Sequence, residues 1–140
     1  MSVVTDLPLS SIPPLVVLLE RFAVCRLLAD AAFPEWAVPG DLLALVRTRD
    51  ELSVVCAERF VPPEIKAERG WRALQVQGQL DFAMVGVLAS IVVPLARAGV
   101  SIFTLSTYET DYVLVKETHL ERATQALTQA GFLVMSYAKD

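Results

Sequence analysis

Few side chains in this chain of 140 residues have the chemistry that catalysis needs. The only histidine, His119, falls at the predicted start of a polar-faced helix, where we expect it to be exposed to solvent. One histidine in that position gives no Ser–His–acid or Cys–His set. Cysteine, histidine and carboxylate residues show no metal-ligand spacing, and the glycines are scattered rather than gathered in a phosphate-binding loop. The sequence therefore predicts a protein that is not an enzyme and uses no metal or other cofactor, with carboxylate-only chemistry left open.

The two cysteines lie within apolar runs that are rich in β-branched residues. A disulfide between Cys25 and Cys56, or a thiol nucleophile, stays open as an alternative. The apolar setting favours two buried free thiols.

The second half of the sequence has the pattern of two helices and four strands. Apolar alternation and short polar turns predict strands at residues 71–78, 100–107, 111–117 and 132–137. Longer apolar patterns, each ending at a glycine, predict helices at residues 82–98 and 119–130. Thr118 and Glu121 would form a capping box at the start of the second helix. The order βαββαβ predicts an α+β, ferredoxin-like fold: a four-stranded antiparallel sheet with both helices on one face.

The first half has strand patterns but is too interrupted by proline for long helices. Strands are predicted at residues 15–19, 22–28, 41–48 and 52–58. At an offset of 59 residues, residues 42–58 overlay residues 101–117, with Thr48 on Thr107. Any two hairpins share some likeness, which is the alternative interpretation. We predict a duplicated unit: residues 1–69 form a degenerate, helix-poor half and residues 70–140 a complete domain.

Composition and charge restrict the partners. The chain is 54% hydrophobic with a net charge of −4 and no basic cluster, which argues against binding to nucleic acid. Mean hydropathy is +0.50, but the charge-free stretches are shorter than a bilayer span, so we expect a cytoplasmic protein without a membrane segment. The helix at residues 82–98 has no polar face and should be buried all round. Either the first half of the chain or a second subunit must cover this helix, and we predict a homodimer.

One segment resembles a known family. Residues 98–117 read AGVSIFTLSTYETDYVLVKE, and their STYxTDYxLVKE core resembles the ACT domains of small bacterial tandem-ACT proteins, of aspartate kinases and of CASTOR-type arginine sensors. Residues 23–30 (AVCRLLAD), 47–58 (RTRDELSVVCAE) and 70–82 (GWRALQVQGQLDF) are similar to the same small bacterial family. The likeness covers most of the chain from about residue 14 onward.

The resemblance implies an ACT fold and a site between ACT units that holds a free amino acid. Two groups of residues would carry this site. They are the turn after the first helix, with Gly99, Val100, Ser101 and Ile102, and the tip of the following hairpin, with Ser106, Thr107 and Asp111.

The side chains and backbone of these residues suit an amino acid. N–H groups where the chain turns at Gly99 can hold a carboxylate, and glycine lets the backbone approach a ligand closely. Asp111 can accept hydrogen bonds from the ammonium group, and Ser106 and Thr107 add two hydroxyl groups. Each residue also has a purely structural interpretation: Gly99 ends a helix, Ser106 and Thr107 begin a turn, and Asp111 caps that turn through its own backbone.

The sequence therefore predicts a non-catalytic regulatory or sensor protein that binds a free amino acid at an interface between ACT units. A protein–protein interaction module with a vestigial ligand site is the alternative. A regulated protein partner would fit either hypothesis.

Overall fold

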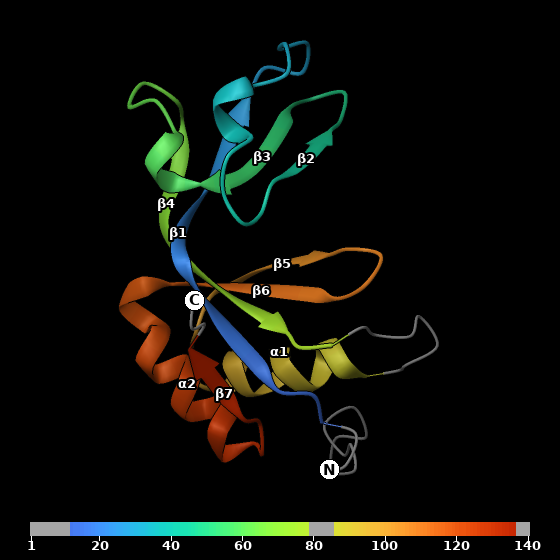
Figure 1. The fold of residues 1–140 in the computed structure, drawn as a ribbon, viewed down its shortest axis with the longest axis vertical. Helices are drawn as coiled ribbons and strands as arrows, with labels where there is room; N and C mark the ends of the chain where they lie inside the picture. Colours follow the sequence, from blue (N-terminus) through green and yellow to red (C-terminus); the bar gives the residue numbers. More distant parts are fainter. Residues whose placement is uncertain (1–11, 79–85, 137–140) are drawn as a thin grey trace. The chain divides into compact units, whose positions relative to one another are not determined.

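The computed structural model describes residues 12–78 and 86–136, which form two compact units (Figure 1). Unit 2 is Glu20–Arg72, and unit 1 contains the described residues before and after it. The chain passes between the units within strand β1 (Leu15–Leu27) and again within strand β4 (Ala67–Val76). The second passage is close to the predicted boundary at residues 69 and 70, but residues 12–19 group with the second half of the sequence. Descent of the two halves from one duplicated unit stays a prediction.

Unit 1 has the predicted order of elements. After β4 come α1 (Val87–Arg97), β5 (Ile102–Ser106), β6 (Asp111–Lys116), α2 (Leu120–Gln129) and β7 (Val134–Ser136). This is the βαββαβ order, and the α+β, ferredoxin-like prediction is confirmed. The first four residues predicted for α1, 82–85, lie outside the described residues.

The sheet of unit 1 contains one strand more than predicted. The first residues of β1 pair in parallel with β7, with Leu15 opposite Val134, and the N–H of Gln77 donates to the Pro14 carbonyl oxygen at 2.8 Å. The strand order in this unit is therefore β7-β1-β4-β6-β5. No local signal predicts this arrangement, because the partners of residues 15–17 lie more than 100 residues further along the chain.

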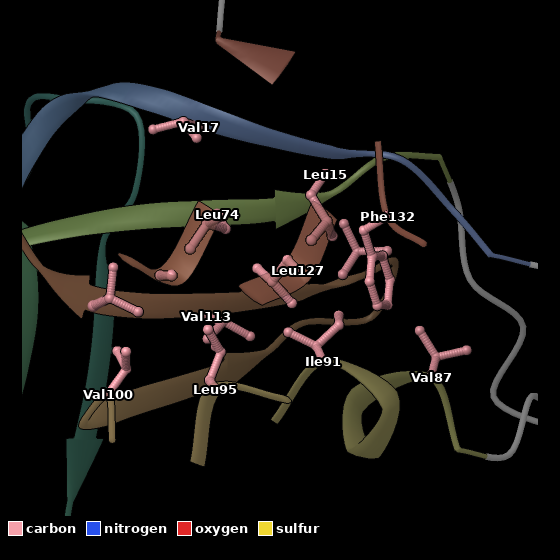
Figure 2. Packing of buried hydrophobic residues seen from close by; sticks show 13 residues of the cluster. Leu15, Val17, Leu74, Val87, Ile91, Leu95, Val100, Val113, Leu127 and Phe132 are labelled. Carbon is pink, nitrogen blue, oxygen red and sulfur yellow. The ribbon is translucent and has the colours of Figure 1, made fainter. Parts of the chain in front are cut away.

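Both helices of unit 1 pack on one face of its sheet, as predicted. Residues two apart on a strand share a face, and three such pairs join the helices in one core (Figure 2). The members of this core are Leu15, Val17, Leu74, Val76, Val113 and Val115 from strands, Val87, Ile91 and Leu95 from α1, Ala123 and Leu127 from α2, and Val100 and Phe132, each of which follows a helix. The side chains of this core are therefore buried between the sheet and the two helices.

The two helices differ in detail from the prediction. Helix α1 buries one face, while Leu88, Ala89, Val92 and Val93 are only partly buried, so α1 is not buried all round within one copy of the chain. Helix α2 follows the 3-10 turn η5 (Glu117–His119), and no side chain caps it. The predicted capping box of Thr118 is wrong, because that residue lies inside the 3-10 turn.

Unit 2 is a sheet without α-helices. Its strand order is β2-β3-β1-β4, with β2 (Ala44–Arg47) and β3 (Leu52–Ala57) antiparallel to each other. Residues 20–72 are all described, and their only helical segments are the 3-10 turns η3 (Glu35–Ala37) and η4 (Glu58–Phe60). The helix-poor prediction is confirmed. The two predicted strands at 15–19 and 22–28 form the single strand β1.

The hairpins of the two units match at the predicted offset of 59 residues. In both hairpins the threonine N–H donates at 2.8 Å across the turn, from Thr48 to the Glu51 carbonyl oxygen and from Thr107 to that of Thr110. The 3-10 turns η4 and η5 follow at the same offset. η5 continues into α2, whereas Pro62 and Pro63 follow η4. The residue before a proline is disfavoured in the α conformation, and Val61, directly before Pro62, is extended, so η4 does not continue into an α-helix.

Candidate functional site

The turn after α1 is a helix terminus whose N–H groups are largely used. Gly99 has a φ of +74°, and its N–H donates to the Ala96 carbonyl oxygen at 3.0 Å. The N–H of Val100 donates to the Leu95 carbonyl oxygen at 3.0 Å, which completes a Schellman motif. These two N–H groups are therefore not directed at a ligand carboxylate, contrary to the chemistry expected from the sequence.

The same turn is open to approach from outside. The Val100 side chain is buried in the core of unit 1 (Figure 2), while Gly99 and Ser101 are exposed and Ile102 begins β5. A Cβ atom built on Gly99 would meet no atom within 4 Å. Space for a ligand beside this turn comes from the exposed edge formed by Gly99 and Ser101, not from Val100.

The other three predicted residues, Ser106, Thr107 and Asp111, lie at the tip of the β5–β6 hairpin. Ser106 and Asp111 are the last paired residues of the two strands, and Ser106 Oγ donates to Asp111 Oδ1 at 2.6 Å. Thr107 Oγ1 accepts from the N–H of Thr110 at 3.2 Å and donates to the Thr110 carbonyl oxygen at 3.1 Å. Thr107 therefore caps the turn, the role that one interpretation gave to Asp111.

Asp111 is left with acceptor capacity at an accessible place. A carboxylate offers about four lone-pair sites, of which the Ser106 hydroxyl uses one. Asp111 is half-buried, whereas Ser106 and Thr107 are exposed. The buried Thr110 hydroxyl donates to the Val76 carbonyl oxygen at 2.7 Å and ties the turn to β4. The tip is thus a fixed, negatively charged group of side chains.

The structure places the two predicted groups at opposite ends of one strand. β5 runs from Ile102 to Ser106, and a rise of about 3.3 Å per residue separates its ends by about 13 Å. The carboxylate and ammonium groups of an amino acid are bonded to the same carbon atom. One ligand therefore cannot touch the Gly99 turn and the Asp111 tip of the same copy.

Unit 2 lacks the polar pair at its matching hairpin. Arg47 stands where unit 1 has Ser106, and its guanidinium group donates to the carbonyl oxygens of Ala29 and Ala31, the latter at 2.8 Å. Leu52 stands in the place of Asp111 and is buried. This hairpin offers no carboxylate at the position that Asp111 occupies in unit 1.

The two cysteines are free thiols in the core of unit 2. A hydrogen bond with Cys56 lowers the pKa of Cys25, burial opposes this, and the positive charge of Arg69 lowers it further. The same hydrogen bond and burial raise the pKa of Cys56 above its usual value. Both side chains are almost completely buried. This arrangement fits two packed thiols, the interpretation that their apolar setting favoured.

Other candidate chemistry is sparse. His119 is partly buried at the start of α2, and its Nδ1 is buried without a hydrogen bond, so the expected exposure of this residue is wrong. Across residues 12–78 and 86–136, histidine, cysteine and carboxylate residues form no group of three that would bind a metal ion. In the same ranges, neither helix has the length and apolarity that a bilayer crossing requires.

Comparison with known proteins identifies the family. A family model of the ACT domain matches residues 66–129, from β4 to the end of α2, and a model of an N-terminal domain matches residues 20–64 in unit 2. The crystal structure of protein Atu0741 from Agobacterium tumefaciens has 32% identity and a TM-score of 0.85, covering 91% of this chain and 95% of that one. The chain contains an ACT domain.

Two further similarities connect this chain with known proteins. The human protein CASTOR3P is 31% identical over an 80-residue alignment that covers 52% of this chain and 49% of CASTOR3P, so the match spans about half of that relative's length. A crystal structure of aspartokinase alpha and beta subunits has 18% identity and a TM-score of 0.60, covering 86% of this chain and 98% of that one. The latter similarity concerns the fold alone.

Proposed function

We propose that this ACT-domain protein is a regulatory or sensor protein that binds a free amino acid at an interface between two ACT units. The family supports a regulatory role. The observation that carries the choice of ligand is the Ser106–Asp111 pair, an accessible carboxylate with a fixed orientation at a hairpin tip. Such a group accepts charge-assisted hydrogen bonds from an ammonium group.

The proposed site needs a second ACT unit, and we place that unit in another copy of the chain. The ends of β5, Ile102 beside the Gly99 turn and Ser106 beside Asp111, are about 13 Å apart, so one ligand must take the turn from one unit and the tip from another. Unit 2 has Leu52 in place of Asp111 and supplies no equivalent tip. A homodimer is therefore part of the proposal, and we place this homodimer in the cytoplasm.

The ligand's carboxylate has fewer donors than the sequence suggested. Gly99 and Val100 use their N–H groups inside the Schellman motif. In this proposal the exposed Ser101, together with Gly99 as a place of close approach, receives the carboxylate end of the ligand.

A panel of free amino acids, tested by ligand-induced shifts of the melting temperature, separates this proposal from its alternative. A ligand that binds only the folded state at 100 times its Kd stabilises the protein by about 2.7 kcal/mol. The proposal expects one amino acid, or one chemical class, to raise the melting temperature saturably. If no amino acid shifts the melting temperature at millimolar concentration, the alternative of a protein–protein interaction module is favoured.

A further inference from the structure

The turn that precedes β2 in unit 2 corresponds to the Gly99 turn of unit 1. Gly40 lies 59 residues before Gly99, the offset that also relates the hairpins, and both glycines have a positive φ, +116° and +74°. The residue after each glycine, Asp41 or Val100, directs its N–H toward an acceptor. The two acceptors are different groups.

In unit 1 the acceptor is the end of a helix, and in unit 2 it is a carboxylate. The Val100 N–H donates to the Leu95 carbonyl oxygen of α1. Unit 2 has only the 3-10 turn η3 and no α-helix before its turn, and the Asp41 N–H donates to Oε1 of Glu20 at 2.8 Å. Loss of the helix would leave this N–H without its carbonyl partner, and a side-chain carboxylate supplies the missing acceptor.

The Glu20 carboxylate contacts three groups: the Asp41 N–H, the Arg59 guanidinium group and the backbone at Gly40. Its side chain is only 10% exposed, and its buried Oε2 lies 2.6 Å from Arg59 Nη1 in an ion pair without an aligned hydrogen bond. The Arg59 guanidinium group also lies 4.7 Å from the centre of the Phe60 ring. A Cβ atom on Gly40 would come within 2.9 Å of Glu20 Oε1, so the backbone approaches the carboxylate as closely as only glycine allows.

We propose that the Gly40–Asp41 turn and Arg59 form a carboxylate-binding site in unit 2, and that the side chain of Glu20 fills this site in place of a free ligand. An N–H donor, a cation and a glycine that permits close approach are the elements that recognise a carboxylate. The chemical class of ligand is therefore a small carboxylate. One consequence rests on the proposed function. If that function holds, each chain offers one open amino-acid site, in unit 1, because the site in unit 2 is filled by the Glu20 side chain.

The test removes the internal carboxylate and supplies a free one. Glu20→Ala retains Cβ, so the missing fragment has the size of acetate. About 0.1 M sodium acetate should raise the melting temperature of this variant by about 5 °C if acetate binds with a Kd of about 10 mM. Sodium chloride at the same ionic strength, and the bulkier trimethylacetate, should not. Acetate should leave the unmodified protein unchanged, and Glu20→Ala combined with Arg59→Gln should respond much less.

A second variant covers the case in which Glu20→Ala does not fold in chloride. Glu20→Ser keeps a polar atom in the γ position and leaves space for formate, so the same comparison is made with formate. Refolding of either variant by its matching carboxylate, followed by circular dichroism, also supports the proposal. If neither variant responds to its matching carboxylate, or if chloride acts equally well, the proposal is overturned.

The two proposals fail independently. Rescue by acetate without amino-acid binding to any variant would support the unit 2 site and contradict the proposed function. Amino-acid binding to the unmodified protein without any rescue would do the reverse.

Discussion

Replacement of Asp111 by asparagine tests the role of the hairpin tip in binding. Asparagine keeps the shape of the side chain, and its carbonyl oxygen still accepts the hydrogen bond that Ser106 Oγ donates at 2.6 Å to Oδ1 in the unmodified protein. Only the negative charge is lost. A hydrogen bond to a charged group contributes about 1.5–3 kcal/mol. Because about 1.4 kcal/mol corresponds to a tenfold change in affinity, Asp111→Asn should weaken amino-acid binding roughly 10- to 150-fold.

Titration calorimetry with the strongest ligand of the amino-acid panel measures this loss. Glu109→Gln is the matched control, because it removes the same charge from an exposed position in the same turn but outside the proposed site. The control should bind within about twofold of the unmodified protein, since Glu109 is exposed and interactions of solvent-exposed charges contribute little. Both variants should keep the melting temperature of the parent.

A purely structural role for Asp111 leads to the opposite results. Asp111→Asn would then bind with unchanged affinity, whereas Asp111→Ala would lower stability by leaving the Ser106 hydroxyl without its acceptor. An affinity of the Asn variant within twofold of the parent would remove Asp111 from the proposed site.

Three further predictions concern packing and assembly. Leu127→Ala should cost about 2–5 kcal/mol of unfolding free energy in chemical denaturation, because Leu127 is fully buried, whereas Leu133→Ala, at a side chain that is 61% exposed, should cost little. Gly40→Ala should destabilise the protein by about 1–3 kcal/mol more than Gly70→Ala does. A Cβ atom at position 40 would meet two atoms at 2.9 Å, whereas one at position 70 would meet none within 4 Å. Equal melting temperatures of the two variants would refute this prediction. Val93→Lys should convert the proposed dimer to a monomer, as measured by light scattering, because Val93 lies on the face of α1 opposite its buried residues. An unmodified protein that is already monomeric would contradict the dimer.

The order of elements could be predicted where each element has its own local signal. Period-two alternation and short polar turns identified β5 and β6, and the apolar stripe of Leu120, Ala123 and Leu127 identified α2. The shift of the start of α2 by a 3-10 turn was not predictable from Thr118 and Glu121, because a capping box and a 3-10 turn use the same residue types.

Long-range pairing could not be predicted. Nothing in residues 15–17 indicates that they pair with residues 134–136 of β7, since no turn joins these two strands and fixes their register. The passage of β1 from one unit to the other has the same cause.

The candidate site was predicted as two groups of residues, which the structure places at opposite ends of β5. The hairpin-tip residues Ser106, Thr107 and Asp111 do lie together. The turn that Thr107 caps brings the end of β5 next to the start of β6, so that Ser106 contacts Asp111. The N–H groups at Gly99 and Val100 are used by the helix end, which the glycine signal alone does not reveal. The Glu20 carboxylate at the Gly40–Asp41 turn was also missed, although extending the 59-residue offset back to Gly40 and Gly99 would have identified the equivalent turn.

The most direct test of the account is titration calorimetry of the unmodified protein with each free amino acid. The account predicts saturable binding of one amino acid or one chemical class, with one ligand bound per chain because only unit 1 carries the Ser106–Asp111 pair. Absence of measurable heat and of any change in melting temperature with every amino acid at millimolar concentration would contradict it.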